Sequence, residues 1–140
     1  MKLLQSFTGG EMVNVQHWQM AHSHGRIAAI DISKSLRQSK DGSIAFMEAP
    51  NSVRSVDSIP FFWTVQFGSS IRYAGHGQGY SEVAIRGSLP QRKFAAYYLK
   101  NGAVAAIATM NADPLAAQTA ERFAAGDVIR RNDIPDSLAC

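Results

Sequence analysis

The dipeptide Asn101-Gly102, which stands between two apolar runs, constrains the fold of this chain more than any other feature. Asparagine and glycine tolerate the positive φ angles of the type I′ turn that joins two strands of a β-hairpin. We therefore expect the flanking runs, "KFAAYYLK" and "AVAAIATM", to be paired antiparallel strands. The stretch "SEVAIRGSL", from Ser81, alternates in the manner of another strand.

A helix is predicted directly after this hairpin, in "NADPLAAQTAERFAAGDVI". Asp113 is placed as its N-cap, Pro114 at its first position and Gly126 just past its end. The face expected to pack on the sheet consists of Leu115, Ala116, Thr119, Ala120, Phe123 and Ala124. The predicted fold class is therefore α+β, an antiparallel sheet with a packed C-terminal helix.

The N-terminal part of the chain has a helical pattern instead. "VNVQHWQMAHSHGRIAAIDIS" repeats apolar residues at helical spacing, which predicts a long helix over about residues 15–33, with Asn14 as cap and Trp18 one turn inside. Residues 37–58 are polar and rich in turn signals, and we predict that they form a linker. Three regions are thus expected: residues 1–36, the linker, and a domain over residues 59–140.

Composition excludes several classes of protein. The hydrophobic share of 46% and charged share of 18% are those of a globular protein, and no apolar run reaches the ~20 residues that a membrane-spanning helix needs. The single cysteine, Cys140, excludes an internal disulfide and indicates a reducing compartment. Because the first residues do not resemble a signal peptide, we expect an intracellular location, cytoplasmic or mitochondrial. The net charge of +3 comes from scattered basic residues, which does not favour nucleic-acid binding.

The sequence contains only weak matches to the motifs that bind nucleotides or metals or carry out catalysis. Residues 75–80, "GHGQGY", are rich in glycine, but a strand rather than a helix is predicted to follow, so we interpret them as a flexible turn. His22 and His24 point to different sides of a helix, and no acidic ligand has a useful spacing, so no metal site is expected. No nucleophile motif or carboxylate pair is present, and no catalytic residue is predicted.

The stretch "IPFFWTVQFGSSIRYAG", residues 59–75, places several aromatic residues in a region interpreted as a loop. Phe62 and Trp63 would either fold into the core of the following sheet or form the wall of a pocket for a flat ligand. Trp18, near a helix N-terminus, is a second large aromatic residue flanked by polar groups. A planar, partly anionic heterocycle would suit both features.

Three stretches together resemble a known family. "VNVQHWQMAHSHGRIAAIDI" resembles the last FAD-domain helix of the flavin-dependent pyridine nucleotide reductases, which include apoptosis-inducing factor and the reductases of bacterial oxygenase systems. "IPFFWTVQFGSSIRYAG" is similar to the Phe-Trp segment that opens their C-terminal domain. "FAAYYLKNGAVAAIATMNADP" and the helix after it match the rest of that domain. The likeness covers about residues 13–132 and is greatest to the apoptosis-inducing factor 3 branch.

This resemblance implies a fragment of an FAD-dependent NAD(P)H oxidoreductase. Residues 1–36 would be a remnant of its FAD-binding domain, and residues 59–140 its reductase C-terminal domain, of the dimerisation type. The family binds FAD and NAD(P)H on glycine-rich βαβ units, which this sequence lacks, so we expect the chain alone to retain neither cofactor and to be inactive. The cofactor-lining residues implied for the intact enzyme are Gln16, His17, Trp18, Phe62, Trp63 and Asn111.

Two departures from the family pattern concern nicotinamide contacts. Gln16 stands where some relatives have an acidic residue, and Ala74 stands where one relative has a carboxylate. The resemblance also implies partners, namely the missing FAD- and NAD-binding domains, a second copy in a homodimer, or an electron-acceptor protein. One alternative is a stand-alone interaction or dimerisation module. Another is single-stranded nucleic-acid binding by Tyr97, Tyr98 and the aromatic residues of the 59–75 stretch.

Overall fold

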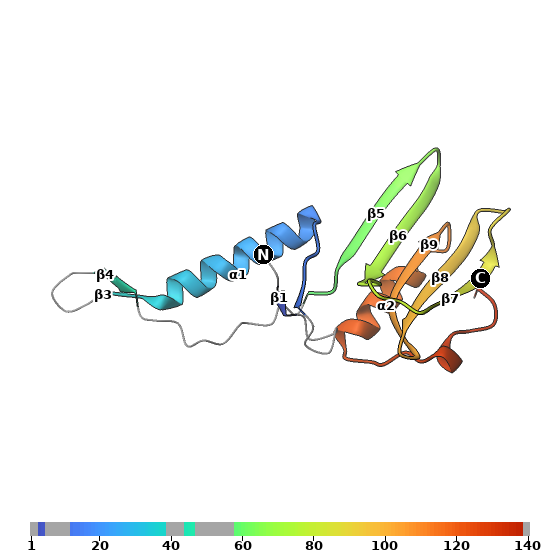
Figure 1. Cartoon of the computed structure of the whole chain (residues 1–140). Helices are drawn as coiled ribbons and strands as arrows, with labels where there is room; N and C mark the ends of the chain where they lie inside the picture. The colour runs from blue at the N-terminus through green and yellow to red at the C-terminus, as the bar shows by residue number, and fades with distance from the viewer. Residues whose placement is uncertain (1–2, 5–11, 39–43, 47–57, 139–140) are drawn as a thin grey trace. The chain divides into compact units, whose positions relative to one another are not determined.

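The computed structural model describes residues 3–4, 12–38, 44–46 and 58–138 (Figure 1). The chain divides into two compact units, Met1–Ser58 and Ile59–Cys140. The first contains a long helix and two short strand pairs, and the second contains a five-stranded sheet followed by a helix. Within the described ranges, no helix has the length and apolar character needed to cross a membrane.

Helix α1, Trp18–Ser35, is the main element of the first unit. Its two antiparallel strand pairs are β1 (Leu3–Leu4) with β2 (Met12–Val13), and β3 (Leu36–Gln38) with β4 (Ile44–Phe46). Strand β3 overlaps the start of the stretch predicted to be a linker, and β4 lies within that stretch. Most of that linker lies outside the described residues.

The predicted start of this helix, at residue 15 with Asn14 as cap, is wrong. Residues 14–17 are not helical, and the Ala21 N–H donates to the carbonyl of His17 at 3.0 Å, which places His17 at the cap position. Trp18 is therefore the first residue of the helix and not one turn inside it. Strand β2, which pairs with β1, ends at Val13, so the predicted cap Asn14 directly follows a strand and residues 14–17 connect that strand to the helix.

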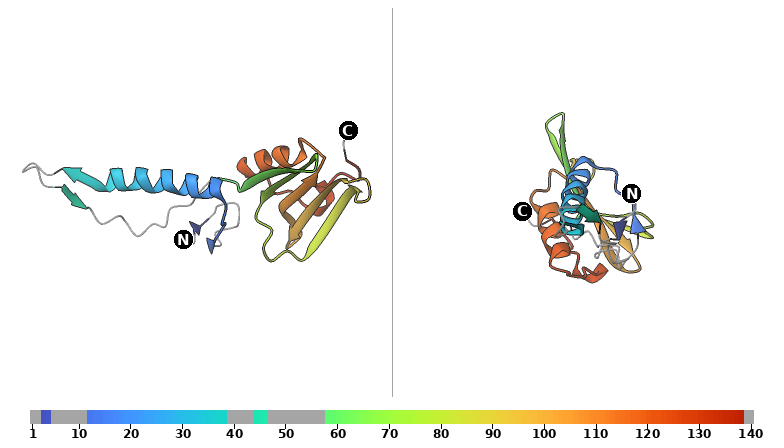
Figure 2. Two further views of the ribbon diagram at one scale, coloured as in Figure 1. Left: turned by 90° about the horizontal axis from the view of Figure 1, so that it is seen from above. Right: turned by 90° about the vertical axis from the view of Figure 1, so that its left-hand side faces the viewer.

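The sheet of the second unit has the strand order β5-β6-β9-β8-β7, with every neighbouring pair antiparallel. Its strands are β5 (Phe61–Gln66), β6 (Ser69–Gly75), β7 (Glu82–Ser88), β8 (Lys93–Lys100) and β9 (Ala103–Met110). Helix α2, Leu115–Ala124, lies on one side of this sheet (Figure 2). The predicted α+β class is confirmed.

Two tight turns build this sheet. Asn101 and Gly102 have φ angles of 54° and 76°, and Lys100 pairs with Ala103 across the turn, so the predicted hairpin is confirmed. The same pattern recurs at Phe67 and Gly68, with φ angles of 49° and 75°, which join β5 to β6. The interpretation of residues 59–75 as a loop is therefore wrong. Phenylalanine is not a usual turn residue, and for that reason this second hairpin was not recognised.

The two ends of helix α2 are capped in different ways. Pro114 occupies the N-cap position, and no side chain caps the helix, so the prediction of Asp113 as N-cap is wrong. At the other end, the Gly126 N–H donates to the carbonyl of Phe123 at 3.0 Å, and the Asp127 N–H donates to that of Arg122 at 2.9 Å. These two bonds form a Schellman motif, with Gly126 at φ 82° in the predicted place.

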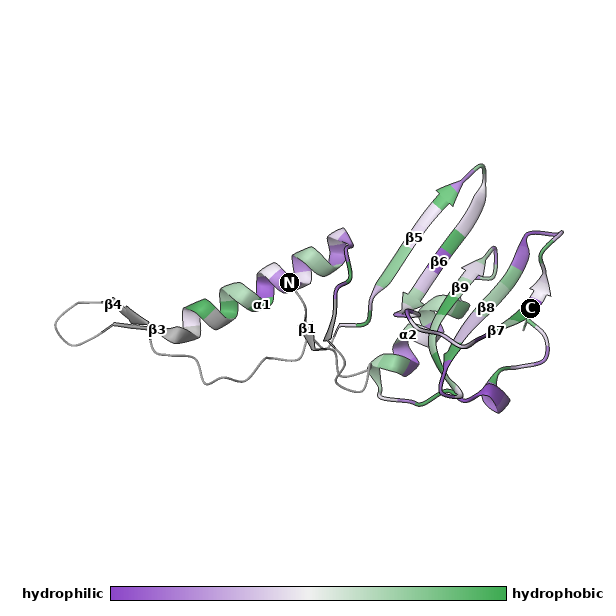
Figure 3. Cartoon of the chain, viewed as in Figure 1, coloured by the Kyte–Doolittle hydropathy of each residue, from purple (hydrophilic) through white to green (hydrophobic). Residues whose placement is uncertain are grey.

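The two faces of the sheet follow from strand pairing, because directly paired residues project to the same side. One side, the covered face, lies under α2 and contributes most of the core: Ala74, Ala84, Ala95, Tyr97, Leu99, Val104 and Ile107. Helix α2 adds Ala116, Thr119 and Phe123, whereas the predicted face residue Ala124 is exposed. The other side, the open face, carries Phe62, Ile71, Tyr73, Val83, Ile85, Phe94, Tyr98, Ala108 and Met110. Apolar positions recur along the strands of the sheet (Figure 3).

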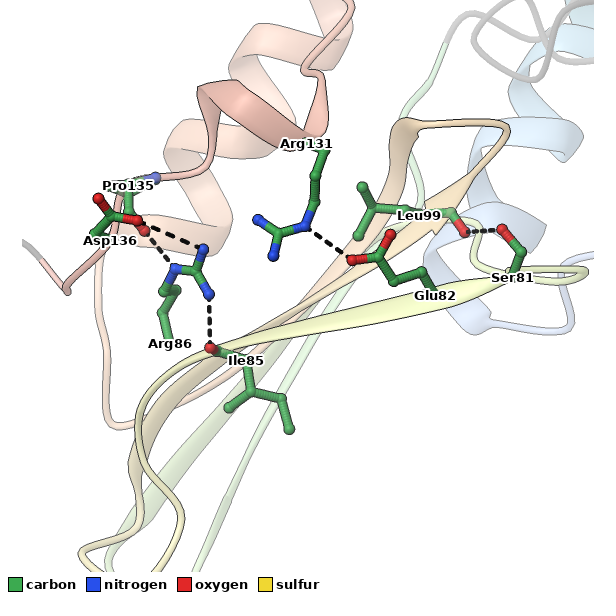
Figure 4. Close-up of polar contacts among 8 residues, drawn as sticks. All are labelled: Ser81, Glu82, Ile85, Arg86, Leu99, Arg131, Pro135 and Asp136. Carbon is green, nitrogen blue, oxygen red and sulfur yellow. Dashed lines mark hydrogen bonds and ion pairs between the residues drawn. The ribbon is translucent and has the colours of Figure 1, made fainter.

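The C-terminal segment, residues 130–138, also packs on the side of the covered face. Arg86 Nε donates to the carbonyl of Pro135 at 2.7 Å, and its guanidinium lies 3.9 Å from Asp136. Arg131 Nε pairs with Glu82 at 2.8 Å (Figure 4). Leu138 lies so close to Gly87 that a Cβ on that glycine would be 2.6 Å from the leucine. Strand β7 is thus tied to the end of the chain.

Candidate cofactor-lining surfaces

The first candidate surface is a hollow of about 340 Å³ around the start of α1. Three of the predicted site residues meet there, because Gln16, His17 and Trp18 all line it. Trp18 is 62% exposed. Its ring lies 6.0 Å from that of His17 and 5.4 Å from that of His22, the latter edge-on. The hollow therefore offers a flat aromatic surface beside imidazoles at the positive end of a helix dipole.

His24 also lines this hollow, and sequence reasoning did not select it. Its Nε2 atom is enclosed and has no hydrogen-bond partner within the part of the chain that the structure describes. Burial lowers the pKa of His24 below its usual value of 6.5. The imidazole is therefore neutral at neutral pH, with one nitrogen able to donate and the other able to accept a hydrogen bond.

The second candidate surface is the hairpin of β5 and β6. Phe62 and Trp63 are consecutive in β5, so their side chains point to opposite faces of the sheet. Trp63 is 59% exposed, which contradicts the interpretation that it belongs to the core. Its neighbour Phe61 packs against the core instead. Trp63 therefore has the exposed aromatic surface that the wall of a binding site would need.

A charged pair adjoins Trp63 on the covered-face side. Arg72 is the cross-strand partner of Trp63, and its Nε forms an ion pair with a carboxylate oxygen of Asp113. Both side chains are partly exposed. Sequence reasoning missed this pair because Asp113 was assigned to helix capping and the strand that carries Arg72 was not recognised. Alternation in "SSIRYAG", residues 69–75, is the signal that could have revealed that strand.

Asn111 stands at the next rung of the sheet, directly after β9. Its Oδ1 accepts from the Ser70 N–H at 2.8 Å, and its Nδ2 donates to the carbonyl of Arg92 at 2.9 Å. Asn111 adopts φ 49°, a left-handed conformation that asparagine tolerates better than most residues. Its side chain thus connects β6 with the turn before β8. Contact of Asn111 with nicotinamide stays a prediction.

A row of aromatic rings crosses the open face. Phe62 stacks on Tyr73 with centroids 5.2 Å apart and 21° between the ring planes. Tyr73 lies 6.2 Å from Tyr98, which meets Tyr80 edge-on at 5.2 Å. The Tyr73 hydroxyl accepts from the Gly77 N–H at 2.9 Å. Burial raises the pKa of Tyr73 above 10, so its hydroxyl is neutral at physiological pH.

In the glycine-rich stretch, Gly75 is the last residue of β6 and residues 76–80 form a turn that leads into β7 rather than a helix. A Cβ on Gly75 would lie 2.3 Å from the carbonyl oxygen of Ala105, so glycine there permits close approach of two backbones. This turn therefore has no helix N-terminus behind it to bind a pyrophosphate. No group of His, Cys, Asp and Glu side chains suited to a metal ion occurs among the residues whose placement is described.

Comparison with protein families identifies the second unit. The family model described as "Reductase C-terminal" matches residues 61–138, more than half of the chain. Human apoptosis-inducing factor 3 is 40% identical over 122 residues, which are 87% of this chain and 17% of that protein. The chain thus spans about a sixth of the length of this relative.

Solved structures of two reductases share the fold. In the covalent complex of putidaredoxin reductase with putidaredoxin, the match has a TM-score of 0.68 and 22% identity and covers 94% of this chain and 27% of that one. The ferredoxin reductase of the CYP199A2 system from Rhodopseudomonas palustris matches with a TM-score of 0.60 and 22% identity, over 88% of this chain and 26% of that one.

Proposed function

The chain belongs to the Reductase C-terminal family, and from this membership we propose that it is the C-terminal part of an FAD-dependent NAD(P)H oxidoreductase related to apoptosis-inducing factor. In the intact enzyme it would line the flavin and nicotinamide site. Residues 1–36 would be the end of the FAD-binding domain, residues 37–58 a linker and residues 59–140 the reductase C-terminal domain. The division of the chain into units ending at Ser58 and starting at Ile59 supports this organisation.

The single structural observation that carries the cofactor-lining part of this proposal is the exposure of Trp63 on a well-formed strand. A tryptophan that is not needed for the core and is held on a hydrogen-bonded strand can present a fixed π face to a planar ring. The described residues fit the ring of a flavin in this respect. They do not fit its pyrophosphate, because the glycine-rich turn lacks the helix that would bind it.

FAD, when bound, would accept a hydride and pass electrons onward. This chain's residues would exclude water from one side of the ring and orient the nicotinamide, with Trp63 as the wall and Phe62 in support. Around α1, Gln16, His17 and Trp18 would present polar groups and a helix N-terminus toward the ring, where they would stabilise negative charge. Asn111 would lie near the nicotinamide. The Arg72–Asp113 pair would limit the movement of the hairpin beside Trp63.

The proposal names three partners for this chain. The FAD- and NAD-binding regions of an intact reductase would complete the cofactor site. An electron-acceptor protein is supported by the likeness to a reductase that was crystallised with putidaredoxin. A second copy of the chain would form a homodimer.

The test is a chimera in which this chain replaces the matching segment of human apoptosis-inducing factor 3. The chimera should purify with flavin, whereas the 140-residue chain alone should not retain FAD through gel filtration. In the chimera, Trp63→Ala should slow flavin reduction by NADH or NADPH by about tenfold or more, because the ring would be exposed and the nicotinamide misplaced. The melting temperature should change little.

Tyr80→Ala is the matched control, because Tyr80 is an aromatic residue of similar exposure in a different part of the domain. It should leave the rate of flavin reduction unchanged. A collapsed melting temperature together with a normal reduction rate in Trp63→Ala would show that Trp63 is structural. If the chain alone retained FAD in stoichiometric amount, it would not depend on the rest of the reductase for cofactor binding, and this part of the proposal would be contradicted.

A further inference from the structure

The turn between β5 and β6 contains a residue that its geometry does not favour. Phe67 and Gly68 have φ angles of 49° and 75°, close to the 54° and 76° of Asn101 and Gly102 in the other hairpin. Asparagine and glycine suit such angles, whereas phenylalanine rarely adopts them. Phe67 is 99% exposed, so it does not contribute to the core either. A strained residue that stabilises neither the turn nor the core indicates a role in function.

This turn projects past the end of the sheet. Strand β6 pairs with β9 only from Ile71 onward, so residues 65–70 extend beyond β9 (Figure 1). At about 3.3 Å per residue, the turn lies roughly 10 Å past the rung at Ile71. Val65, in the last part of β5, is 58% exposed. The hairpin therefore ends in a narrow projection with apolar side chains.

A second exposed turn lies at the same end of the sheet. Residues 89–92 join β7 to β8, and Leu89 among them is 51% exposed. Asn111 connects the two turns, because its amide accepts from the Ser70 N–H at 2.8 Å and donates to the carbonyl of Arg92 at 2.9 Å. Residues 65–70 and 89–93 thus form one surface of fixed geometry, the tip surface.

The charge on the tip surface is positive. Arg92 and Lys93 are both exposed, and neither side chain forms an ion pair with any residue that the structure describes. The carboxylate of Asp113 follows β9 at this end of the sheet, but it is paired with Arg72. Basic side chains beside protruding apolar ones are typical of proteins that bind the surface of a membrane with anionic lipids.

A lipid surface fits this shape better than a protein partner does. A stable protein interface buries about 800 Å² on each partner, with closely complementary surfaces. A narrow projection offers that area only to a partner with a matching pocket. The headgroup region of a bilayer is fluid and opens around a projecting side chain, and apolar groups of peripheral proteins enter it by about 5–10 Å. The length of the projection matches this depth.

We propose that the tip surface binds membranes that contain anionic lipids. Phe67 enters the headgroup region, Val65 and Leu89 lie at its margin, and Arg92 and Lys93 contact the negatively charged headgroups. The chain lies on the bilayer and does not cross it. This inference goes beyond the proposed function, and its test needs no flavin, so the two proposals fail separately.

The experiment is flotation of the full 140-residue chain with lipid vesicles. One set of vesicles is phosphatidylcholine alone, and the other contains equal amounts of phosphatidylcholine and phosphatidylserine. The chain should float with the second set and much less with the first, and high salt should weaken the binding because it screens the charges. Absence of binding to both sets, or equal binding to both, would overturn the proposal.

Phe67→Asn separates membrane binding from folding. Asparagine is the residue that this turn geometry favours, so the melting temperature should stay the same or rise. The partition coefficient for the mixed vesicles should fall by about tenfold, because the inserted ring is lost. Tyr80→Ala is the matched control, since Tyr80 is an exposed aromatic residue before the start of β7, at the other end of that strand, and it should leave binding unchanged.

A charge variant tests the electrostatic part. Arg92→Gln combined with Lys93→Gln should lower the partition coefficient by about tenfold or more. Arg130→Gln combined with Arg131→Gln removes the same charge from the opposite end of the sheet, where Arg130 pairs with Ala103 beside the β8–β9 turn. This control should bind as the unmodified chain does. Equal losses in the two double variants would mean that binding follows net charge and not the tip surface.

A measurement without variants locates the contact. In bicelles of the mixed lipids that carry a spin label, amide NMR signals of residues 66–69 and 89–93 should broaden most. Broadening centred on α2 or on the β8–β9 turn would overturn the proposal. The chimera described above should show the same dependence on Phe67, because a tip covered by the rest of a reductase would contradict membrane binding. Binding of an acidic protein through Phe67, without binding to vesicles, would assign the tip surface to a protein partner instead.

Discussion

The covered and open faces of the sheet are both apolar, but among the described residues of the second unit only the covered face lies under a helix. On the covered face, Tyr97, Leu99 and Ile107 are almost fully buried beneath α2. On the open face, Phe62, Val83 and Ile85 remain exposed although their chemistry is the same. Burial here is therefore decided by whether another element lies on top and not by hydrophobicity. An apolar residue stabilises a fold only where packing removes it from water.

This contrast predicts unequal costs for similar substitutions. Phe123→Ala, in the middle of α2, should lower the free energy of unfolding by about 3–5 kcal/mol, because it leaves a cavity over the covered face. Phe94→Ala on the open face should cost about 1 kcal/mol or less. Urea denaturation would measure both. Equal losses would show that the two faces do not differ in packing.

The C-terminal segment offers the next largest effect. Arg86→Ala should cost about 1.5–3 kcal/mol, because the guanidinium has little exposure and donates to the carbonyl of Pro135. Hydrogen exchange at residues 134–138 should speed up as the segment detaches from the covered face. Arg131→Ala removes an exposed ion pair with Glu82 and should cost at most about 1 kcal/mol. If Arg131→Ala proves the more harmful, β7 is held in another way.

The turn between β8 and β9 determines which residues project to each face. Gly102→Val should destabilise the domain by about 1 kcal/mol or more, because valine tolerates φ 76° poorly. A register shift of one residue would exchange the covered and open faces of a strand. The melting temperature would report the loss, with Gln91→Val in the exposed turn before β8 as control. An unchanged melting temperature would contradict the strain assigned to this turn.

The smallest expected effect concerns the pH dependence of stability. Burial raises the pKa of Tyr73 above the unfolded value of 10, so folding favours the neutral hydroxyl. The stability that this provides is present below pH 10 and is lost as the pH rises through the folded pKa. Tyr73→Phe should therefore reduce the alkaline loss of stability, measured by denaturation at increasing pH. The loss that remains would include Tyr97, whose pKa is also raised by burial. Identical profiles would mean that Tyr73 is solvated.

Parts of the fold with strong local signals were predictable from the sequence. Asn101-Gly102 specified a turn by backbone geometry alone, and Gly126 marked the end of α2. The second hairpin was missed because its turn has phenylalanine at a left-handed position, a choice that no propensity favours. Asp113 has the chemistry of a helix cap, but its carboxylate forms an ion pair with Arg72, which is distant in sequence. Long-range contacts of this kind override local preference.

The candidate site was predictable only as a set of residues suggested by family resemblance. The structure adds that Gln16, His17 and Trp18 share one hollow, and that Phe62 and Trp63 project to opposite faces of β5. Neither Arg72 nor His24 was predicted as a site residue. The ion pair of Arg72 and the enclosure of the His24 imidazole both arise from tertiary structure, which sequence patterns do not reveal. The amide of Asn111 is bound to two backbone groups, which its position in the sequence does not reveal.

By itself the sequence determined the β8–β9 hairpin, the presence and C-terminal end of α2, and the family. It did not determine which face of the sheet is covered. The run "KFAAYYLK" is apolar at both alternating sets of positions, so periodicity does not distinguish Phe94 and Tyr98 from Ala95 and Tyr97. Helix α2 and the C-terminal segment pack over Ala95, Tyr97 and Leu99, and this choice depends on contacts between elements far apart along the chain. The alternation of a strand defines two faces, and only packing decides which of them becomes the core.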